Sequence, residues 1–147
     1  MKLHQLSLFL ENRPGKVKVP CKILAEAGIN IVTLSLADTQ QFGILRLIVK
    51  DWQKAKQSLE SRGCVVNVTE VLAIDVEDEP GGLLKILDTL EKASIAIEYM
   101  YAFTSLSQSG KACMIFRFEN PDAAIKALSA AGINVVASSE LFERTRA

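Results

Sequence analysis

The chain has 147 residues, of which 49% are hydrophobic and 23% are charged, and its 17 lysines and arginines balance its 17 aspartates and glutamates. Without net charge it has no electrostatic reason to bind nucleic acid or an anionic membrane, and no apolar run approaches the ~20 residues of a membrane-spanning helix. Its three widely spaced cysteines, Cys21, Cys64 and Cys113, fit neither a disulfide framework nor a zinc site.

The first half of the chain predicts four strands and two helices. Apolar residues recur at helical spacing from Val17 to Ala27, and Gly28 is a natural C-terminal cap. A second helix is expected after Asp51, which can cap it, and ends at Gly63. The strands are predicted over residues 6–10, 29–36, 44–50 and 64–69. This order of strand, helix, strand, strand, helix, strand is the split βαβ arrangement.

The second half repeats that order. Pro14 matches Pro80 at an offset of 66 residues, and Gly63 matches Gly132 at an offset of 69. The strands are predicted over residues 71–76, 95–103, 112–118 and 133–136. An internal repeat in which spacing, turn residues and element order agree indicates duplication of one structural unit. We therefore expect an α+β protein with two ferredoxin-like βαββαβ domains.

No linker separates the two repeats, because the chain passes from one predicted strand to the next through residues 69–71. This predicts one domain over residues 1–70 and another over residues 71–147. Each should form an antiparallel sheet with its helices on one face, and the two sheets should lie side by side. The other face of each sheet must then be covered or polar. Apolar residues at Val32, Leu34 and Leu36, or at Tyr99 and Tyr101, are expected to need cover there.

The most informative stretch is Glu11-Asn12-Arg13-Pro14-Gly15-Lys16, which joins the first predicted strand to the first helix. A helix start leaves backbone N–H groups unpaired, and these groups suit a carboxylate or a phosphate. The arrangement returns as Glu77-Asp78-Glu79-Pro80-Gly81-Gly82. Asn12 can contact a ligand there, but an asparagine in this position can also serve only as a helix N-cap.

With these residues in view, the sequence resembles a tandem pair of ACT domains, the small regulatory modules that bind amino acids in metabolic enzymes. The resemblance covers essentially the whole chain and rests on residues 11–15 and on Gly28-Ile29-Asn30-Ile31. The second repeat keeps Pro80-Gly81 but has Ala96 in place of the asparagine. No kinase, dehydrogenase or hydroxylase domain accompanies the pair, so the resemblance implies a stand-alone regulator.

The resemblance also implies a ligand site where two ACT domains lie side by side. A free amino acid would bind between the first loop of one domain and the start of the second strand of its neighbour. The implied site residues are Asn12, Arg13, Pro14, Gly15, Lys16, Val17, Asn30, Ile31, Asp78 and Ala96. If the halves of one chain pair, Asn12 faces Ala96 and Asp78 faces Asn30. If like domains pair across a dimer, Asn12 and Asn30 from different chains meet.

Partners and activity follow from the same residues. The apolar surface to be covered predicts a homodimer. The single histidine, His4, has no nucleophile motif beside it, and no phosphate-binding glycine loop or metal-ligand cluster is present, so we expect no enzyme activity and no cofactor. The N-terminus lacks the apolar core of a signal peptide, which predicts a cytoplasmic protein. The alternative is a ligand-free interaction module that pairs with a metabolic enzyme or another ACT protein.

Overall fold

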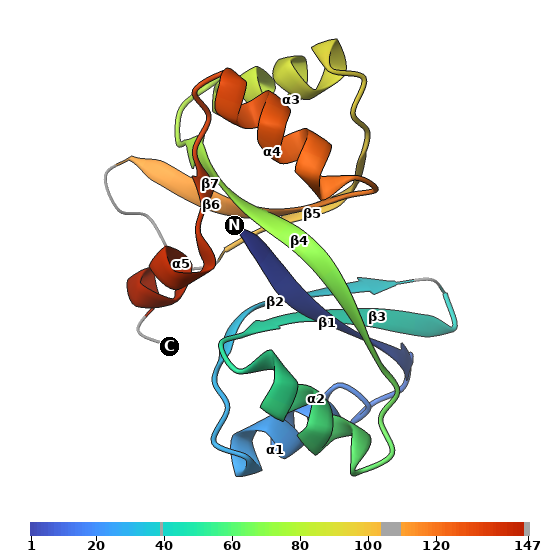
Figure 1. Cartoon of the computed structure of the whole chain (residues 1–147). Coiled ribbons are helices and arrows are strands. Elements are labelled where there is room, and N and C mark those ends of the chain that lie inside the picture. Colours follow the sequence, from blue (N-terminus) through green and yellow to red (C-terminus); the bar gives the residue numbers. More distant parts are fainter. Residues whose placement is uncertain (39, 104–109, 146–147) are drawn as a thin grey trace. The chain divides into compact units, whose positions relative to one another are not determined.

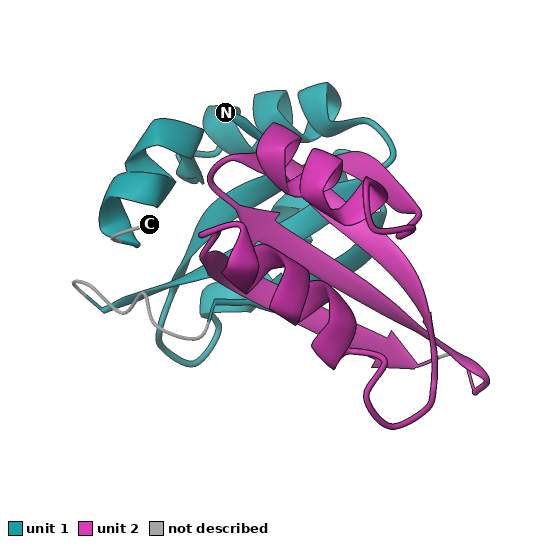
Figure 2. Ribbon diagram, turned by 90° about the horizontal axis from the view of Figure 1, so that it is seen from below, with its two compact units in different colours: residues 1–3, 70–146 teal, residues 4–69, 147 magenta. Residues whose placement is uncertain are grey.

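Figure 1 shows the computed structural model of the chain, which describes residues 1–38, 40–103 and 110–145. The described residues form two compact units (Figure 2): unit 2 contains residues 4–69, and unit 1 contains residues 1–3 and 70–145. Each unit follows the order strand, helix, strand, strand, helix, strand. The predicted fold class, an α+β protein with two ferredoxin-like βαββαβ units, is confirmed.

Unit 2 is built on the strand order β2-β3-β1-β4, in which β1–β3 and β2–β3 are antiparallel pairs. Its elements are β1 (Lys2–Glu11), α1 (Lys18–Glu26), β2 (Ile31–Asp38), β3 (Phe42–Val49), α2 (Trp52–Glu60) and the first residues of β4 (Val66–Glu77). Leu6 and Leu8 of β1 and Leu45 and Leu47 of β3 form a buried core with residues of both helices. Asp51 caps α2 as predicted, since its carboxylate accepts a hydrogen bond from the Lys54 N–H at 3.0 Å.

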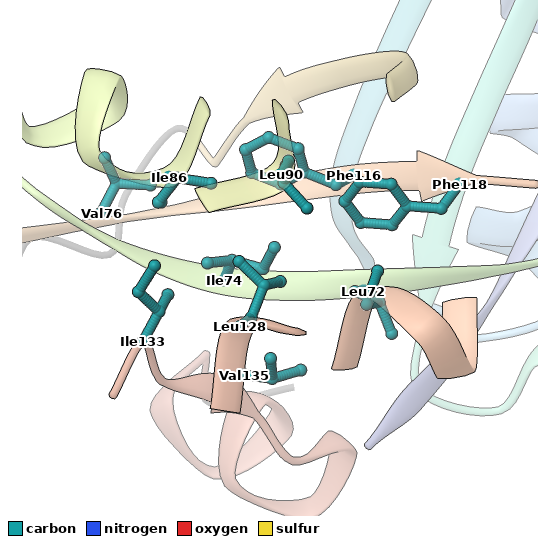
Figure 3. Packing of buried hydrophobic residues seen from close by; sticks show 11 residues of the cluster. Leu72, Ile74, Val76, Ile86, Leu90, Phe116, Phe118, Leu128, Ile133 and Val135 are labelled. Carbon is teal, nitrogen blue, oxygen red and sulfur yellow. The ribbon is translucent and has the colours of Figure 1, made fainter. Parts of the chain in front are cut away.

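Unit 1 is built on the strand order β7-β4-β6-β5, and all three pairs are antiparallel. Its elements are the remainder of β4, α3 (Gly82–Lys92), β5 (Ile97–Ala102), β6 (Lys111–Phe118), α4 (Pro121–Ala130), β7 (Val135–Val136) and α5 (Ser138–Arg144). Figure 3 shows Ile86 and Leu90 of α3 and Leu128 of α4 packed with residues of β4 and β6. This cluster is the core of the unit.

The two units repeat each other down to local irregularities. The register of β2 shifts between Ile31 and Thr33, and that of β5 shifts at the corresponding place, between Ile97 and Tyr99. Both α1 and α3 are followed by a residue in the left-handed conformation. The N–H of the next residue, Ile29 or Ile95, donates a hydrogen bond at 2.9 Å to the carbonyl five positions back. That left-handed residue is Gly28 (φ 69°) in unit 2 but Ser94 (φ 56°) in unit 1.

Several element boundaries differ from those predicted. The strands predicted over 64–69 and 71–76 are one continuous strand, β4, because residues 69–71 contain no turn-forming residue to interrupt it. β2 begins at Ile31 rather than at residue 29, because the Ile29 N–H is bound by the end of α1. The last strand is only Val135–Val136 instead of 133–136.

The register of β2 also corrects the expected place of its leucines. Leu34 pairs with Leu47 and Leu36 pairs with Leu45, so both leucines lie on the helix-covered face rather than on the opposite one. They are nevertheless 44% and 53% exposed, and the β2 strand that carries them is the edge strand of the sheet. Tyr99 pairs with Arg117, on the face of β5 opposite the unit 1 core.

Helix α5 was not predicted, and it lies on the sheet face opposite α3 and α4. Ile74 and Val76 point into the core, so Asp75 between them points to the other face. There the Asp75 carboxylate accepts hydrogen bonds from Arg144 of α5 at 2.9 and 3.3 Å and from Asn134 at 2.8 Å. This paired carboxylate holds α5 against β4.

One ring contact in unit 2 joins the start of β1 to α2. The imidazole of His4 stacks on the indole of Trp52, with ring centroids 4.5 Å apart.

Among the residues that the structure describes, no helix combines the length and apolarity needed to span a bilayer.

Candidate functional site

The loop of residues 11–17 in unit 2 is fixed by Asn12. The Asn12 N–H donates to the Gln41 carbonyl at 3.0 Å, and its side-chain Nδ2 donates to the Gln40 carbonyl at 3.3 Å. Helix α1 instead begins after Val17, with no side-chain cap. The interpretation of Asn12 as a helix N-cap is therefore wrong: Asn12 ties the loop to the turn between β2 and β3.

The other loop residues shape the turn or form its rim. Gly15 has φ +86°, which a residue with a side chain adopts only with strain, and the Lys16 N–H donates to the Arg13 carbonyl at 3.3 Å. Arg13 forms an ion pair with Glu11. Their side chains are 69% and 43% exposed, so the pair contributes little stability and can rearrange around a ligand.

A cavity of about 190 Å³ opens beside this loop. It is lined by Leu10, Glu11, Asn12, Arg13, Val17, Leu36, Ala37, Asp38 and Gly43. The structure thus brings together three of the predicted site residues and adds others from β2 and β3. Sequence reasoning missed the latter because only the strand register shows that the end of β2 lies beside the loop. Gly43, which pairs with both Leu10 and Asp38, was the available signal.

Asn30 and Ile31 lie at the opposite end of β2. Asn30 lines a separate hollow of about 210 Å³ with Gly28, Ile29, Lys50, Asp51 and Lys54, while Ile31 packs against the core. The eight residues of β2 extend over about 23 Å at roughly 3.3 Å per step. Asn12 and Asn30 of one unit therefore cannot contact the same small ligand.

The loop of unit 1 begins with the same turn. The Asp78 N–H donates to the Gly110 carbonyl at 2.9 Å, and the Gly82 N–H donates to the Glu79 carbonyl at 3.0 Å, as their counterparts do in unit 2. The helix then starts two positions sooner, at Gly82, whereas α1 starts at Lys18. Asp78 does not cap it, because the N-cap is Gly81 and no side chain bonds there.

Gly82 explains this early start. A Cβ atom at this position would lie 1.9 Å from the Glu77 carbonyl oxygen, so only glycine allows the helix to approach the end of β4 so closely. Lys16 stands at the equivalent position in unit 2 and cannot make that approach. Gly82 lines a hollow of about 60 Å³ together with Gly132, Ile133 and Asn134, and Asp78 does not line it. Ala96 lines a different, shallow depression beside α3.

These observations define a duplicated ferredoxin-like protein with a cavity beside the strand-to-helix loop of unit 2. A family model described as an ACT domain pair matches residues 1–144, and the chain belongs to that family. The resemblance seen in the sequence is thereby confirmed, and an ACT domain pair is a regulatory rather than a catalytic module.

Solved structures agree. Protein BT0572 from Bacteroides thetaiotaomicron is 36% identical, with 97% of each chain covered and a TM-score of 0.89. The ligand-free regulatory subunit of aspartate kinase from Thermus thermophilus is 18% identical, with 88% of this chain and 92% of that chain covered and a TM-score of 0.63. The corresponding subunit from Thermus flavus is 17% identical, with coverage of 89% and 92% and a TM-score of 0.60. No curated protein sequence matches the chain.

Proposed function

We propose that this protein binds a free amino acid at the cavity beside residues 11–17 and thereby regulates amino-acid metabolism without catalysing a reaction. The supporting observation is that this cavity combines an apolar interior with the Asn12 amide and the uncapped start of α1. The amide can donate to a carboxylate or accept from an ammonium group. Backbone N–H groups at the helix start favour the ligand carboxylate.

The proposed assembly is a homodimer through the edge strand β2. Leu34 and Leu36 leave an apolar stripe exposed along that edge, and an exposed edge strand is a natural pairing surface. Two copies of β2 paired antiparallel about a two-fold axis would place the end of one strand beside the start of the other. Asn30 and Ile31 of one copy would then lie near Asn12 of the second, which gives two equivalent sites.

Unit 1 is proposed to carry no working site. Asp78, which stands where unit 2 has Asn12, would place a negative charge where the ligand carboxylate should bind. Ala96 also lacks the polar group that Asn30 offers. The residues predicted from the second repeat are therefore expected to contribute little to binding.

The regulated partner is proposed to be an enzyme of amino-acid metabolism in the cytoplasm. The regulatory character of ACT domain pairs supports the first point, and three free cysteines favour a reducing compartment. The exposed stripe of Leu34 and Leu36 also favours a second candidate function, a ligand-free module that pairs with an enzyme or another ACT protein.

A thermal-shift screen with the twenty amino acids separates the two functions, because a ligand that binds only the folded state raises the melting temperature. For the amino acid that binds, Asn12→Ala should weaken binding by about 1 to 3 kcal/mol in calorimetry, since a polar ligand group loses its partner. Asp78→Ala is the matched control and should change it far less. Equal losses, or none for Asn12→Ala, would contradict the site. A monomer mass by light scattering would contradict the dimer.

A further inference from the structure

We propose that the ligand is an α-amino acid with an uncharged aliphatic side chain of the size of valine, leucine, isoleucine or methionine. This inference rests on the proposed function and concerns the same cavity. It follows from what forms the floor of the cavity and from the charges on its rim.

The floor is apolar. In the register of the sheet, Leu10 pairs with Gly43 and Leu36 with Leu45, so Leu10, Gly43 and Leu36 lie on one face of neighbouring strands. Val17 closes the cavity from the start of α1. Aliphatic side chains offer no hydrogen-bond partner, and a polar or charged ligand group buried among them would lose its hydration without compensation.

Gly43 allows the Leu36 side chain to lie close against β3 in this floor. A Cβ atom there would lie 3.1 Å from Leu36 Cδ1, tighter than most real contacts, so any side chain at this position would fill the space or displace the leucine. The resulting cavity of about 190 Å³ is below the roughly 300 to 1,000 Å³ of sites that hold drug-sized ligands. It suits a compact side chain better than the long chain of lysine or arginine or the ring system of tryptophan.

The rim adds electrostatic selection. Its charged side chains are Glu11, Arg13 and Asp38, and Arg13 is already paired with Glu11. The Asp38 carboxylate at the end of β2 therefore remains to attract the ammonium group of the ligand. The same charge repels a second carboxylate, which disfavours aspartate and glutamate.

The test uses the full-length protein and titration calorimetry with L-valine, L-leucine, L-isoleucine, L-methionine, L-aspartate, L-glutamate, L-lysine and L-arginine as probes. At least one aliphatic probe should bind tenfold or more tightly than every charged probe. Leu36→Asp should weaken that binding at least tenfold, because it places a charge against the ligand side chain. Asp38→Asn should lower the affinity for the aliphatic probe severalfold. It should also reduce the ratio between that affinity and the affinity for L-aspartate.

Leu34→Asp measures the part of any loss that acts through assembly, because Leu34 lies on the same strand and face and in the same exposed stripe but does not line the cavity. Binding is compared at a protein concentration at which light scattering shows both variants to be dimers. A larger loss in Leu36→Asp than in Leu34→Asp supports the aliphatic cavity, and equal binding by the two variants overturns it. Tight binding of a charged amino acid that depends on Asn12 would overturn the proposal of an aliphatic ligand. The proposed function, binding of a free amino acid, would then still stand. Failure of all twenty amino acids to bind would overturn both.

Discussion

Replacing Gly82 by alanine tests why the two loops differ. A Cβ at this position would lie 1.9 Å from the Glu77 carbonyl oxygen, and the gap must widen by more than 1 Å to reach even a tight contact of 3.0 Å. The cheapest relaxation is a later helix start, as in α1. A helix that starts two positions later loses its first two backbone bonds, which are accepted by the carbonyls of Gly81 and Gly82; the first of them, from the Lys85 N–H to the Gly81 carbonyl, is 3.2 Å long. At about 1 kcal/mol for each bond, Gly82→Ala should cost about 2 kcal/mol.

Thermal unfolding followed by circular dichroism measures this loss. For a chain of this size about 2 kcal/mol corresponds to a fall in melting temperature of roughly 4 to 8 °C. Lys16→Ala, at the equivalent position of unit 2, is the matched control and should change stability by less than about 0.5 kcal/mol, because Lys16 is exposed. A Gly82→Ala variant as stable as the parent protein would refute the close approach of α3 to β4.

Two further predictions concern unit 1. Ser94→Gly should stabilise the protein by about 0.5 to 1 kcal/mol, measured by chemical denaturation, because serine is strained at φ 56° where α1 uses glycine; a loss of stability would contradict this. Burial, assisted by the negative charge of Asp75, raises the pKa of the Cys113 thiol to about 12. Alkylation of Cys113 in the folded protein, followed by peptide mass spectrometry, should therefore keep rising about tenfold per pH unit beyond pH 10, where an ordinary thiol levels off.

The sequence was sufficient for the repeat and for most helix boundaries, because those features depend on local chemistry. Gly28, Gly63 and Gly132 adopt left-handed conformations at helix ends, and Asp51 caps α2, as residue type alone indicates. Ser94 also takes this conformation, which only its alignment with Gly28 could reveal. The agreement between the two halves supplied information that no single stretch contains.

The cavity and α5 could not be predicted in the same way, because both depend on contacts between distant residues. Asp38 joins the loop of Asn12 only once β2 and β3 have paired in their observed register. Helix α5 is seven residues long, too short for a clear apolar period, and it is held by the pairing of Arg144 with Asp75 across 69 positions. Local pattern carries no signal of such a partner.

Trp52, stacked on His4, gives unit 2 a fluorescent group that unit 1 lacks. Trp52 is the only tryptophan of the chain and belongs to unit 2, so fluorescence emission excited at the indole band reports on that unit alone. It also directly follows Asp51, which lines the hollow of Asn30. Occupancy of the proposed site that Asn30 completes can therefore be followed as a change in Trp52 emission without any attached dye. Unit 1 contributes no tryptophan emission.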